Sequence, residues 1–340
     1  MTSEKKEIIL VPVRVKRPFD IGRYEVERQA LVPHDVEFVE CLINGPEILN
    51  MASKAKALYV RGVHIDRTII EKLDNCAVIA LASVGVEYVD VETATQKGIP
   101  VTNCPDTFTE EVADHALALM LAAHKRVLEQ DRMVREGRWQ QGRAQLMQIP
   151  RLFGQSLGLL GFGRVARAVC RRALPFGLKV MAYDPYVSET EIISAGAEPV
   201  SHEEVLTRSD FLSLHLPKSE KTKNLIGENA LKIMKKTSVL VNTGRGSTVD
   251  EDALVSALRR GWIAGAALDV FQQEPLDTSC QLIDLPNVIL SPHVASASTR
   301  FEPARKRRVG HEIGLIFNGM YPMSCANPDV LPRSGLRQWH

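Results

Sequence analysis

The 340-residue chain has few cysteines, no long apolar run and almost no net charge. Lys and Arg number 42 and Asp and Glu 41, so no strong field of one sign draws the protein toward nucleic acid or an acidic membrane. The six cysteines form neither CxxC pairs nor a metal-ligand spacing, which predicts reduced thiols and no metal site. The run "IILVPVRV" is too short and too charged to span a bilayer. We therefore expect a cytoplasmic protein with small-molecule partners, and neither nucleic acid nor a membrane among them.

Short apolar runs alternate with helical stretches in two parts of the chain. Between residues 8 and 101 the candidate strands are "IILVPVRV", "VEFVECLI", "ALYVRG", "AVIALASVGV" and "GIPVTN". From residue 156 they are "SLGLLGF", "KVMAYD", "FLSLHL", "SVLVNT", "AGAALDVF" and "VILSPHV". This alternation predicts parallel strands joined by crossover helices, with six strands in the second sheet. Because the chain exceeds the usual size of one domain, we expect an α/β fold with two doubly wound parallel-sheet domains.

A long helix is expected between the two sets of strands. The stretch "TEEVADHALALMLAAHKRVLEQDRMVREG", residues 109–137, has apolar residues at helical spacing over most of its length. Thr107 with Glu110, or Thr109 alone, would cap its start, and Gly137 would end it. A last helix is expected in "TRFEPARKRRVGHEIGLIFNG", residues 299–319.

A glycine motif between a predicted strand and a predicted helix indicates dinucleotide binding. In "LGLLGFGRVARA", Gly161 permits a tight turn, Gly163 lets a pyrophosphate approach the backbone, and Ala166 is small enough for close packing. The next strand ends at Asp184, whose carboxylate would bind both ribose hydroxyls and repel a 2'-phosphate, which favours NAD over NADP. The plainer alternatives are a tight turn without a ligand and an ordinary Asp-Pro turn. Strand, glycines, helix and acid together favour NAD.

Three later segments place reactive side chains at the ends of predicted strands. "VNTGRGSTVDEDAL" contains Arg245, "AALDVFQQEPL" contains Asp269 and Glu274, and "LSPHVAS" contains His293. Arg245 would hold a substrate carboxylate or polarise its carbonyl. His293 would exchange a proton with the substrate oxygen, and Glu274 would orient the imidazole and raise its pKa. Each residue also has a plain interpretation as a surface charge, a turn acid or a polar residue at a strand end.

Several motifs, in order along nearly the whole chain, resemble one family. They are "SVGVEYVD", "GIPVTNCPDTFTEEVADHALALML", "REGRW", "GLLGFGRVA", "NTGRGSTVDEDALVSALRRGWIAGAALDVFQQEPL" and "LSPHVAS". The family is that of the D-isomer-specific 2-hydroxyacid dehydrogenases. The resemblance implies a Rossmann NAD domain, residues 106–296, inserted into a flavodoxin-like substrate-binding domain formed by residues 1–105 and 297–340. It also implies a homodimer joined through the NAD domains, to which the long helix after Thr109 contributes.

The resemblance also implies roles for individual residues. Catalytic roles fall on Arg245, Glu274 and His293, and the backbone N–H groups of Val84 and Gly85 would bind the substrate carboxylate together with Arg245. Contacts to NAD fall on Gly161, Gly163, Arg164, Val165, Asp184, Pro217, Thr222, Thr243, Gly244, Asp269 and Ser296.

Some positions depart from the common pattern of the family. Asp106 stands where glycine is usual, Phe108 replaces a frequent asparagine, and Ser296 replaces the glycine of "HIAG". "NxPD" followed by "TEEVADH" resembles a subgroup like the C-terminal-binding proteins, which are NAD-dependent corepressors. Phe108 and Ser296 would lie near the cofactor and the active site. These two departures therefore affect which substrate the protein takes more than the type of reaction.

Two functions are therefore compared. The first is a reductase that transfers a hydride from NADH to a small 2-keto acid to give the D-2-hydroxy acid. The second is an NAD(H)-sensing binding protein with little or no turnover, which the 47 residues after His293 disfavour because they leave little room for a recruitment tail. Arg61 and His64 are either pocket residues that favour an extra anionic group or ordinary surface residues. The sequence leaves the particular acid open.

Overall fold

The computed structural model describes residues 6–338 apart from 17, 19 and 21. Contacts within the chain divide it into two units. The split unit consists of Met1–Thr107 and Ser298–His340, and the central unit consists of Phe108–Ala297. Each has its own parallel sheet, so the α/β class and the two parallel sheets expected from the alternation of strands and helices are confirmed.

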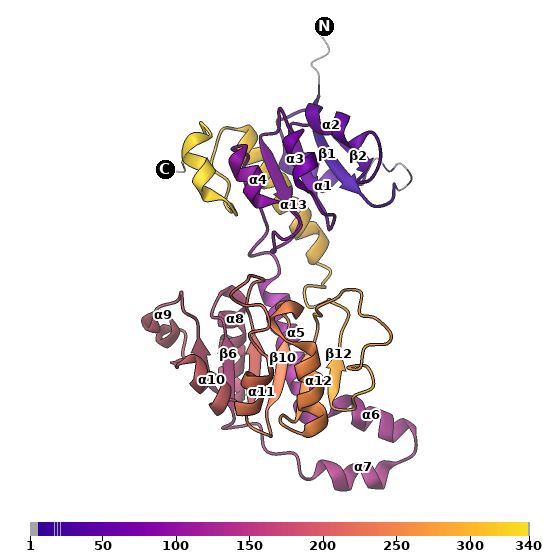
Figure 1. Ribbon diagram of the computed structural model, residues 1–340, viewed down its shortest axis with the longest axis vertical. Helices are drawn as coiled ribbons and strands as arrows, with labels where there is room; N and C mark the ends of the chain where they lie inside the picture. The colour runs from indigo at the N-terminus through magenta and orange to yellow at the C-terminus, as the bar shows by residue number, and fades with distance from the viewer. Residues whose placement is uncertain (1–5, 17, 19, 21, 339–340) are drawn as a thin grey trace. The chain divides into compact units, whose positions relative to one another are not determined.

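The split unit has a five-stranded parallel sheet in the order β2-β1-β3-β4-β5 (Figure 1), which is the flavodoxin-like order. Its strands are β1 Glu7–Val13, β2 Val36–Leu42, β3 Ala57–Val60, β4 Val78–Leu81 and β5 Val101–Thr102. Its helices are α1 Glu25–Ala30, α2 Ile48–Lys54, α3 Arg67–Glu71, α4 Val91–Gln96 and α13 Phe301–Phe317, followed by the 3-10 turn Pro328–Arg333. Four of the five strands fall within the apolar runs that predicted them, and β1 begins one residue before its run, at Glu7.

The C-terminal segment completes the split unit. Helix α13 packs against α1, where a Cβ on Gly310 would lie 2.7 Å from the carbonyl oxygen of Glu27. Farther on, the buried side chain of Asn327 accepts a hydrogen bond from the backbone N–H of Val101 at 2.8 Å and donates to the carbonyl of Ile99 at 3.0 Å. Residues from both chain ends therefore build one core.

The central unit has a seven-stranded parallel sheet in the order β12-β11-β10-β9-β6-β7-β8. Its strands are β6 Ser156–Leu160, β7 Lys179–Tyr183, β8 Glu198–Pro199, β9 Phe211–Leu214, β10 Val239–Asn242, β11 Gly265–Leu268 and β12 Val288–Leu290. Its helices are α5 Thr109–Lys125, α6 Val127–Arg135, α7 Trp139–Leu146, α8 Arg164–Ala173, α9 Glu189–Ser194, α10 His202–Arg208, α11 Glu228–Ile233 and α12 Glu251–Arg260, with 3-10 turns at Leu174–Phe176 and Gly246–Thr248. One core joins the sheet to α5 and α8, and a second joins it to α10, α11 and α12 (Figure 1).

The central sheet and the long helix correct two details of the prediction. The prediction of six strands was wrong by one, because the edge strand β8 is only two residues long and includes a proline, so no apolar run marks it. The single helix over residues 109–137 is broken at Arg126, whose φ is 53°. No glycine or proline marks that break. Gly137, with a φ of 72°, follows the end of α6 as predicted.

The start of α5 also differs from the prediction. Phe108 occupies the N-cap position, and no side chain caps the helix there. The predicted cap by Thr107 with Glu110, or by Thr109 alone, was therefore wrong. Glu110 instead forms ion pairs with Arg171 at 2.8 Å and Arg172 at 2.5 Å, so its carboxylate is held on α8.

Candidate active site

The carboxyl ends of three neighbouring strands, β10, β11 and β12, carry the predicted reactive side chains. Arg245 follows β10, Asp269 and Glu274 follow β11, and His293 follows β12. Because parallel strands point the same way, the segments that follow them emerge at one edge of the sheet. The fold thus brings together four residues that are up to 48 positions apart in the sequence (293 − 245).

His293 and Glu274 are in direct contact. The imidazole Nδ1 of His293 lies 2.6 Å from Oε2 of Glu274, and the other carboxylate oxygen accepts the backbone N–H of Phe271 at 3.0 Å. The hydrogen bond to Glu274 raises the pKa of His293 above its ordinary value, against partial burial and the positive charge of Arg245. Burial alone would raise the pKa of Glu274, but the hydrogen bonds from His293 and Phe271 hold it below its ordinary value. The pair therefore favours an imidazolium beside a carboxylate.

The Arg245 loop is braced by Asn242, which the sequence interpretation did not single out. The buried Asn242 side chain accepts the N–H of Gly244 and donates to the carbonyl of Arg245, both at 3.0 Å. The backbone of Gly246 packs closely against the loop after β11, because a Cβ on Gly246 would lie 1.9 Å from the carbonyl carbon of Phe271. The positive charge of Arg245 also lowers the pKa of both His293 and Glu274, so the guanidinium lies within electrostatic reach of the pair.

Asp269, which was predicted to contact NAD, is hydrogen-bonded to the turn that carries His293. Its side chain is fully buried, and its carboxylate accepts the backbone N–H groups of Val294 at 3.0 Å and Ala295 at 2.8 Å. Its own carbonyl accepts the N–H of His293 at 2.9 Å. The carboxylate is thus enclosed by the turn that carries His293, and the contact of Asp269 with NAD stays a prediction. The "ALD" run showed only that an acid ends β11, not that the turn closes over it.

The glycine loop after β6 is shaped for close approach of a ligand. Gly161 has a φ of 87°, and a Cβ on it would lie 2.7 Å from the carbonyl oxygen of His215. At Gly163 a Cβ would meet nothing within 4 Å, so the backbone there borders open space. Gly163 is also the N-cap of α8 and provides no side-chain cap, so the first N–H groups of that helix, including those of Arg164 and Val165, have no capping side chain.

Asp184 links the glycine loop to the end of β7. One carboxylate oxygen accepts the backbone N–H of Phe162, and the other accepts that of Tyr186, both at 2.8 Å. Each oxygen keeps further acceptor capacity. The acid is therefore fixed beside the glycines, in a position suited to ribose hydroxyls.

The segments after β9 and β10 provide the other predicted cofactor residues. Thr222 donates from Oγ1 to the carbonyl of Pro217 at 2.7 Å, which fixes that loop. The hydroxyl of Thr243 is buried and has no hydrogen-bond partner within the described part of the chain. A buried hydroxyl normally finds a partner, so Thr243 Oγ1 fits a polar ligand at this edge. With the open loop at Gly163, this observation fits a dinucleotide held by the central unit.

The predicted substrate loop lies in the split unit, after β4. The side chain of Ser83 donates to the carbonyl of Gly85 at 2.7 Å, and Asn103 donates to that of Val84 at 2.6 Å. Ser324 donates to Asn103 at 2.5 Å and fixes that amide in turn. With both carbonyls bound, the loop is fixed by its oxygens, and Val84 itself is 40% exposed.

The two residues left open for substrate selection both have partners inside the split unit. Arg61 lies 3.6 Å from a carboxylate oxygen of Glu302, with its guanidinium 5.8 Å from the ring centre of Tyr59. His64 lies 3.1 Å from the carbonyl of Tyr88 through Nδ1. These contacts are those of ordinary partly exposed side chains.

The three departures from the family pattern have different surroundings. Asp106 forms an ion pair with Arg308 at 2.6 Å. Phe108 is buried at the start of α5, with 7% of its surface exposed. Ser296 is half-buried beside the Asp269 turn.

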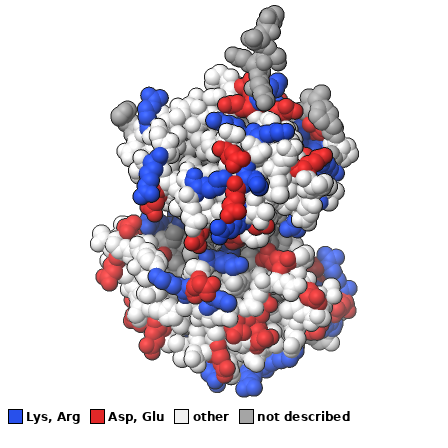
Figure 2. Space-filling view, turned by 45° about the horizontal axis from the view of Figure 1, so that its top comes forward, with Lys and Arg blue, Asp and Glu red and all other residues white. Residues whose placement is uncertain are grey.

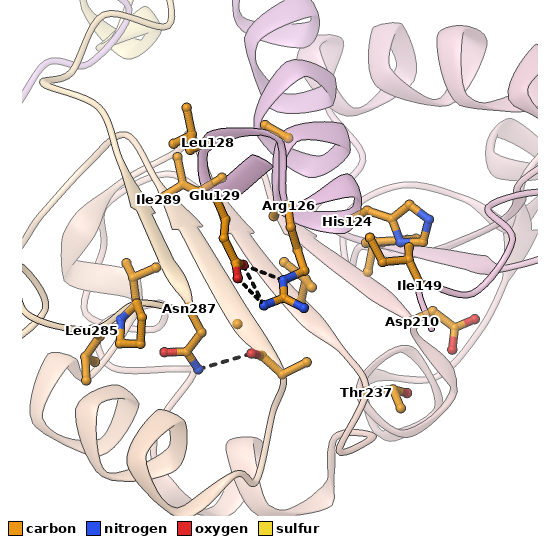
Figure 3. Close-up of a pocket in the computed structure, with 18 of the residues that line it drawn as sticks. His124, Arg126, Leu128, Glu129, Ile149, Asp210, Thr237, Leu285, Asn287 and Ile289 are labelled. Carbon is orange, nitrogen blue, oxygen red and sulfur yellow. Dashed lines mark hydrogen bonds and ion pairs between the residues drawn. The ribbon is translucent and has the colours of Figure 1, made fainter. Parts of the chain in front are cut away.

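A large cavity of the central unit lies away from these residues. Its volume is about 1100 Å³, and its lining includes Phe211, Val239, Gly265 and Val288, the first residues of β9 to β12. Figure 3 shows His124, Arg126 and Glu129 over the same cavity. It therefore opens at the amino ends of the strands, opposite the edge that carries His293.

The fold and the site define the class of protein. A doubly wound parallel sheet, a glycine loop open to a ligand and a histidine–carboxylate pair near an arginine are the parts of a nicotinamide-dependent oxidoreductase. The D-isomer specific 2-hydroxyacid dehydrogenase, NAD binding domain, matches residues 117–295. A glyoxylate reductase of Korarchaeum cryptofilum is 42% identical over 268 residues, which cover 78% of this chain and 81% of that protein. The chain belongs to the D-isomer-specific 2-hydroxyacid dehydrogenase family.

Two solved structures extend this similarity to the fold. An NADPH-dependent glyoxylate/hydroxypyruvate reductase of Sinorhizobium meliloti, in complex with NADP and malonate, is 29% identical, with a TM-score of 0.80 and coverage of 96% of this chain and 98% of that one. A D-lactate dehydrogenase of Aquifex aeolicus, in complex with NAD and lactic acid, is 26% identical, with a TM-score of 0.79 and coverage of 96% and 98%. The protein is thus an oxidoreductase with a nicotinamide cofactor, and the comparisons favour the enzyme over the sensing protein.

Proposed function

We propose that the protein reduces a small 2-keto acid, such as glyoxylate or hydroxypyruvate, to the 2-hydroxy acid with NADH. The observation that carries the proposal is the 2.6 Å contact between His293 and Glu274, which stabilises the protonated imidazole. The relatives named for reduction of glyoxylate support the choice of a small acid. The narrower likeness to C-terminal-binding proteins stays a prediction.

Each residue of the site has a defined task in this reaction. A bound NADH would supply the hydride for the carbonyl carbon. His293 donates a proton from Nε2 to the carbonyl oxygen, while Glu274 holds Nδ1 and stabilises the cation. Arg245 binds the carboxylate of the substrate through its planar guanidinium. The part of the Val84 and Gly85 N–H groups in binding the substrate carboxylate stays a prediction of the family resemblance. In the opposite direction the neutral imidazole accepts the proton.

The central unit is proposed to bind NAD(H), as predicted for residues 106–296, and the split unit to bind the substrate, as predicted for residues 1–105 and 297–340. The first N–H groups of α8, at Arg164 and Val165, would bind the pyrophosphate. Asp184 would bind the adenosine ribose and disfavour a 2'-phosphate, which makes NAD the preferred cofactor. Pro217, Thr222, Thr243, Gly244 and Ser296 would complete the cofactor site.

A homodimer through the central unit is also proposed. The α6–α7 segment, which is defined here as residues 127–153, exposes a set of apolar side chains. Their exposed fractions are Val127 48%, Leu128 60%, Val134 53%, Trp139 62%, Met147 80% and Phe153 64%. A group of this kind is typical of a surface that another chain covers. The cavity of about 1100 Å³ (Figure 3) is lined in part by the same segment. A second copy of the chain would cover both.

The predictions of no nucleic-acid partner, no membrane partner and a cytoplasmic location rest on charge and hydropathy. Figure 2 shows Lys and Arg interspersed with Asp and Glu over the face drawn, which agrees with the net charge of +1. Within residues 6–338, apart from 17, 19 and 21, no helix has the length and apolar character needed to cross a membrane. A cytoplasmic location stays a prediction of the sequence.

The direct test is consumption of NADH with glyoxylate, hydroxypyruvate, pyruvate, phenylpyruvate and branched 2-keto acids. We expect turnover with glyoxylate or hydroxypyruvate and weaker turnover with phenylpyruvate and the branched acids. Tight NADH binding without turnover of any acid would contradict the proposal and favour the sensing protein.

A further inference from the structure

The turn that carries His293 is wrapped around one buried carboxylate. His293 donates its backbone N–H to the carbonyl of Asp269, while Val294 and Ala295 donate theirs to the Asp269 side chain. Within this turn His293 has a φ of 52°. A residue with a Cβ rarely adopts that conformation, and it persists where surrounding contacts hold it. Here the contacts that hold it converge on Asp269.

Two further side chains, those of Ser291 and His115, lie next to the same carboxylate. Ser291 donates from Oγ to Oδ1 of Asp269 at 2.6 Å. His115, on α5, lies with Nε2 3.0 Å from that Oγ and 3.5 Å from Oδ1. Because the Ser291 hydroxyl donates its hydrogen bond to Asp269, its oxygen is left to accept a hydrogen bond from the Nε2–H of His115. The chain of hydrogen bonds therefore runs from His115 through Ser291 to Asp269.

This chain joins α5 to the catalytic turn across 176 positions of sequence. His115 belongs to α5 and not to the segments that follow the strands, and its side chain is 26% exposed. The side chain of Ser291 links the end of β12 to the Asp269 carboxylate. Neither side chain takes part in the pairing of β12 with β11, which uses the backbone of Val288, Ile289 and Leu290. Their shared target is the side chain that fixes His293.

We propose that His115 and Ser291 are positioning residues for the catalytic histidine, which they act on through the carboxylate of Asp269. The proposal rests on the proposed function, because it takes His293 as the proton donor. Loss of either hydrogen bond would let the carboxylate and the turn shift, and His293 would then meet both Glu274 and the substrate less well. A misplacement of about 1 Å costs on the order of 100-fold in rate.

The test uses paired variants of the full-length protein. Ser291→Ala and His115→Leu remove the hydrogen bonds, while Ser291→Thr and His115→Gln keep a hydroxyl and an N–H donor. Ser238→Ala is the control, because it removes another hydroxyl of the central unit that donates a hydrogen bond, here to the carbonyl of Lys235 at 2.8 Å, at the amino end of β10. The readouts are kcat and KM for glyoxylate, the Kd of NADH and the pH dependence of kcat/KM.

We expect Ser291→Ala and His115→Leu to lower kcat about 10- to 100-fold with KM and the Kd of NADH within about twofold. The groups that face His293 are Glu274, Asp269 and Arg245. Weaker contact with Glu274 lowers the pKa of His293, so the high-pH fall of kcat/KM should move to lower pH. Ser291→Thr and His115→Gln should retain most of the activity, and Ser238→Ala should match the parent.

Two outcomes overturn the inference in different ways. Parental kcat and an unmoved pH profile in Ser291→Ala and His115→Leu, with His293→Gln inactive, would refute the positioning role and leave the proposed function intact. A fully active His293→Gln would refute the proposed function and the inference that rests on it. A loss of kcat in Ser238→Ala equal to that in Ser291→Ala would show a general effect of losing a hydrogen-bonded hydroxyl, and would also overturn the inference.

Discussion

His293 and Glu274, which follow adjacent strands of the central sheet, lie 2.6 Å apart through Nδ1 and Oε2. Glu274 is itself held by the backbone N–H of Phe271 at 3.0 Å. The acid therefore cannot turn away from the imidazole without losing a second hydrogen bond. This leaves Nε2 as the ring nitrogen suited to exchange a proton with a substrate.

Replacement of His293 tests the proton transfer directly. His293→Gln should lower kcat by about 100- to 10,000-fold, because that is the usual contribution of a general acid. The Kd of NADH should stay close to that of the parent, because the glycine loop and Asp184 are unchanged. Steady-state kinetics and a fluorescence titration of NADH check the two parts. A variant with parental kcat would refute the role of His293.

The pH dependence of the reaction tests the role of Glu274. Reduction needs the imidazolium, so kcat/KM should be highest below the pKa of His293 and fall as the pH rises through it. Glu274 raises the pKa of His293. Glu274→Gln should therefore move the fall of kcat/KM to lower pH and also lower its maximum.

Glu203→Gln is the control for Glu274→Gln, because it also removes one negative charge from the central unit, at an exposed residue of α10, and leaves the His293–Glu274 contact intact. An unmoved profile in Glu274→Gln would show that the carboxylate does not set the pKa of the catalytic group.

Asp184 tests the choice of cofactor. Asp184→Ala should weaken NADH more than NADPH, because the acid that binds the ribose and repels a 2'-phosphate is lost. The variant also loses two hydrogen bonds, from Phe162 and Tyr186, and that loss affects both cofactors. The ratio of the two Kd values is therefore the informative quantity. An unchanged ratio would count against the ribose contact.

Much of the fold was predictable because its signals are local. Apolar runs marked β1 and the other long strands, and the glycine pattern marked the loop at Gly161, where a positive φ of 87° requires glycine. The edge strand β8 and the break at Arg126 were not predictable in this way. A two-residue strand has no pattern of its own, and an arginine with positive φ is held by contacts that the sequence does not display.

The candidate site likewise contains residues that the sequence predicted and residues that it did not. Arg245, Glu274 and His293 were predicted because reactive side chains at strand ends are visible in sequence. The bracing by Asn242 and the chain from His115 to Asp269 were not, because each depends on contacts made only after folding. His115 gave no signal, since a histidine on a long amphipathic helix is usually a polar surface residue. The hydrogen bonds that the turn donates to the buried Asp269 carboxylate were not predicted either, and the contact of Asp269 with NAD stays a prediction.

The exposed apolar side chains of the α6–α7 segment test the dimer. Leu128 and Trp139 are 60% and 62% exposed, and burial of such side chains in an interface contributes about 1.5–3 kcal/mol each. Leu128→Glu with Trp139→Glu should therefore shift the protein from dimer to monomer at micromolar concentration, as measured by light scattering after gel filtration. Ile193→Glu, at a residue of α9 that is 59% exposed, adds the same kind of charge elsewhere on the central unit and should leave the dimer intact. A parent protein that is already monomeric under these conditions, or a double variant that remains dimeric, would contradict the proposed interface.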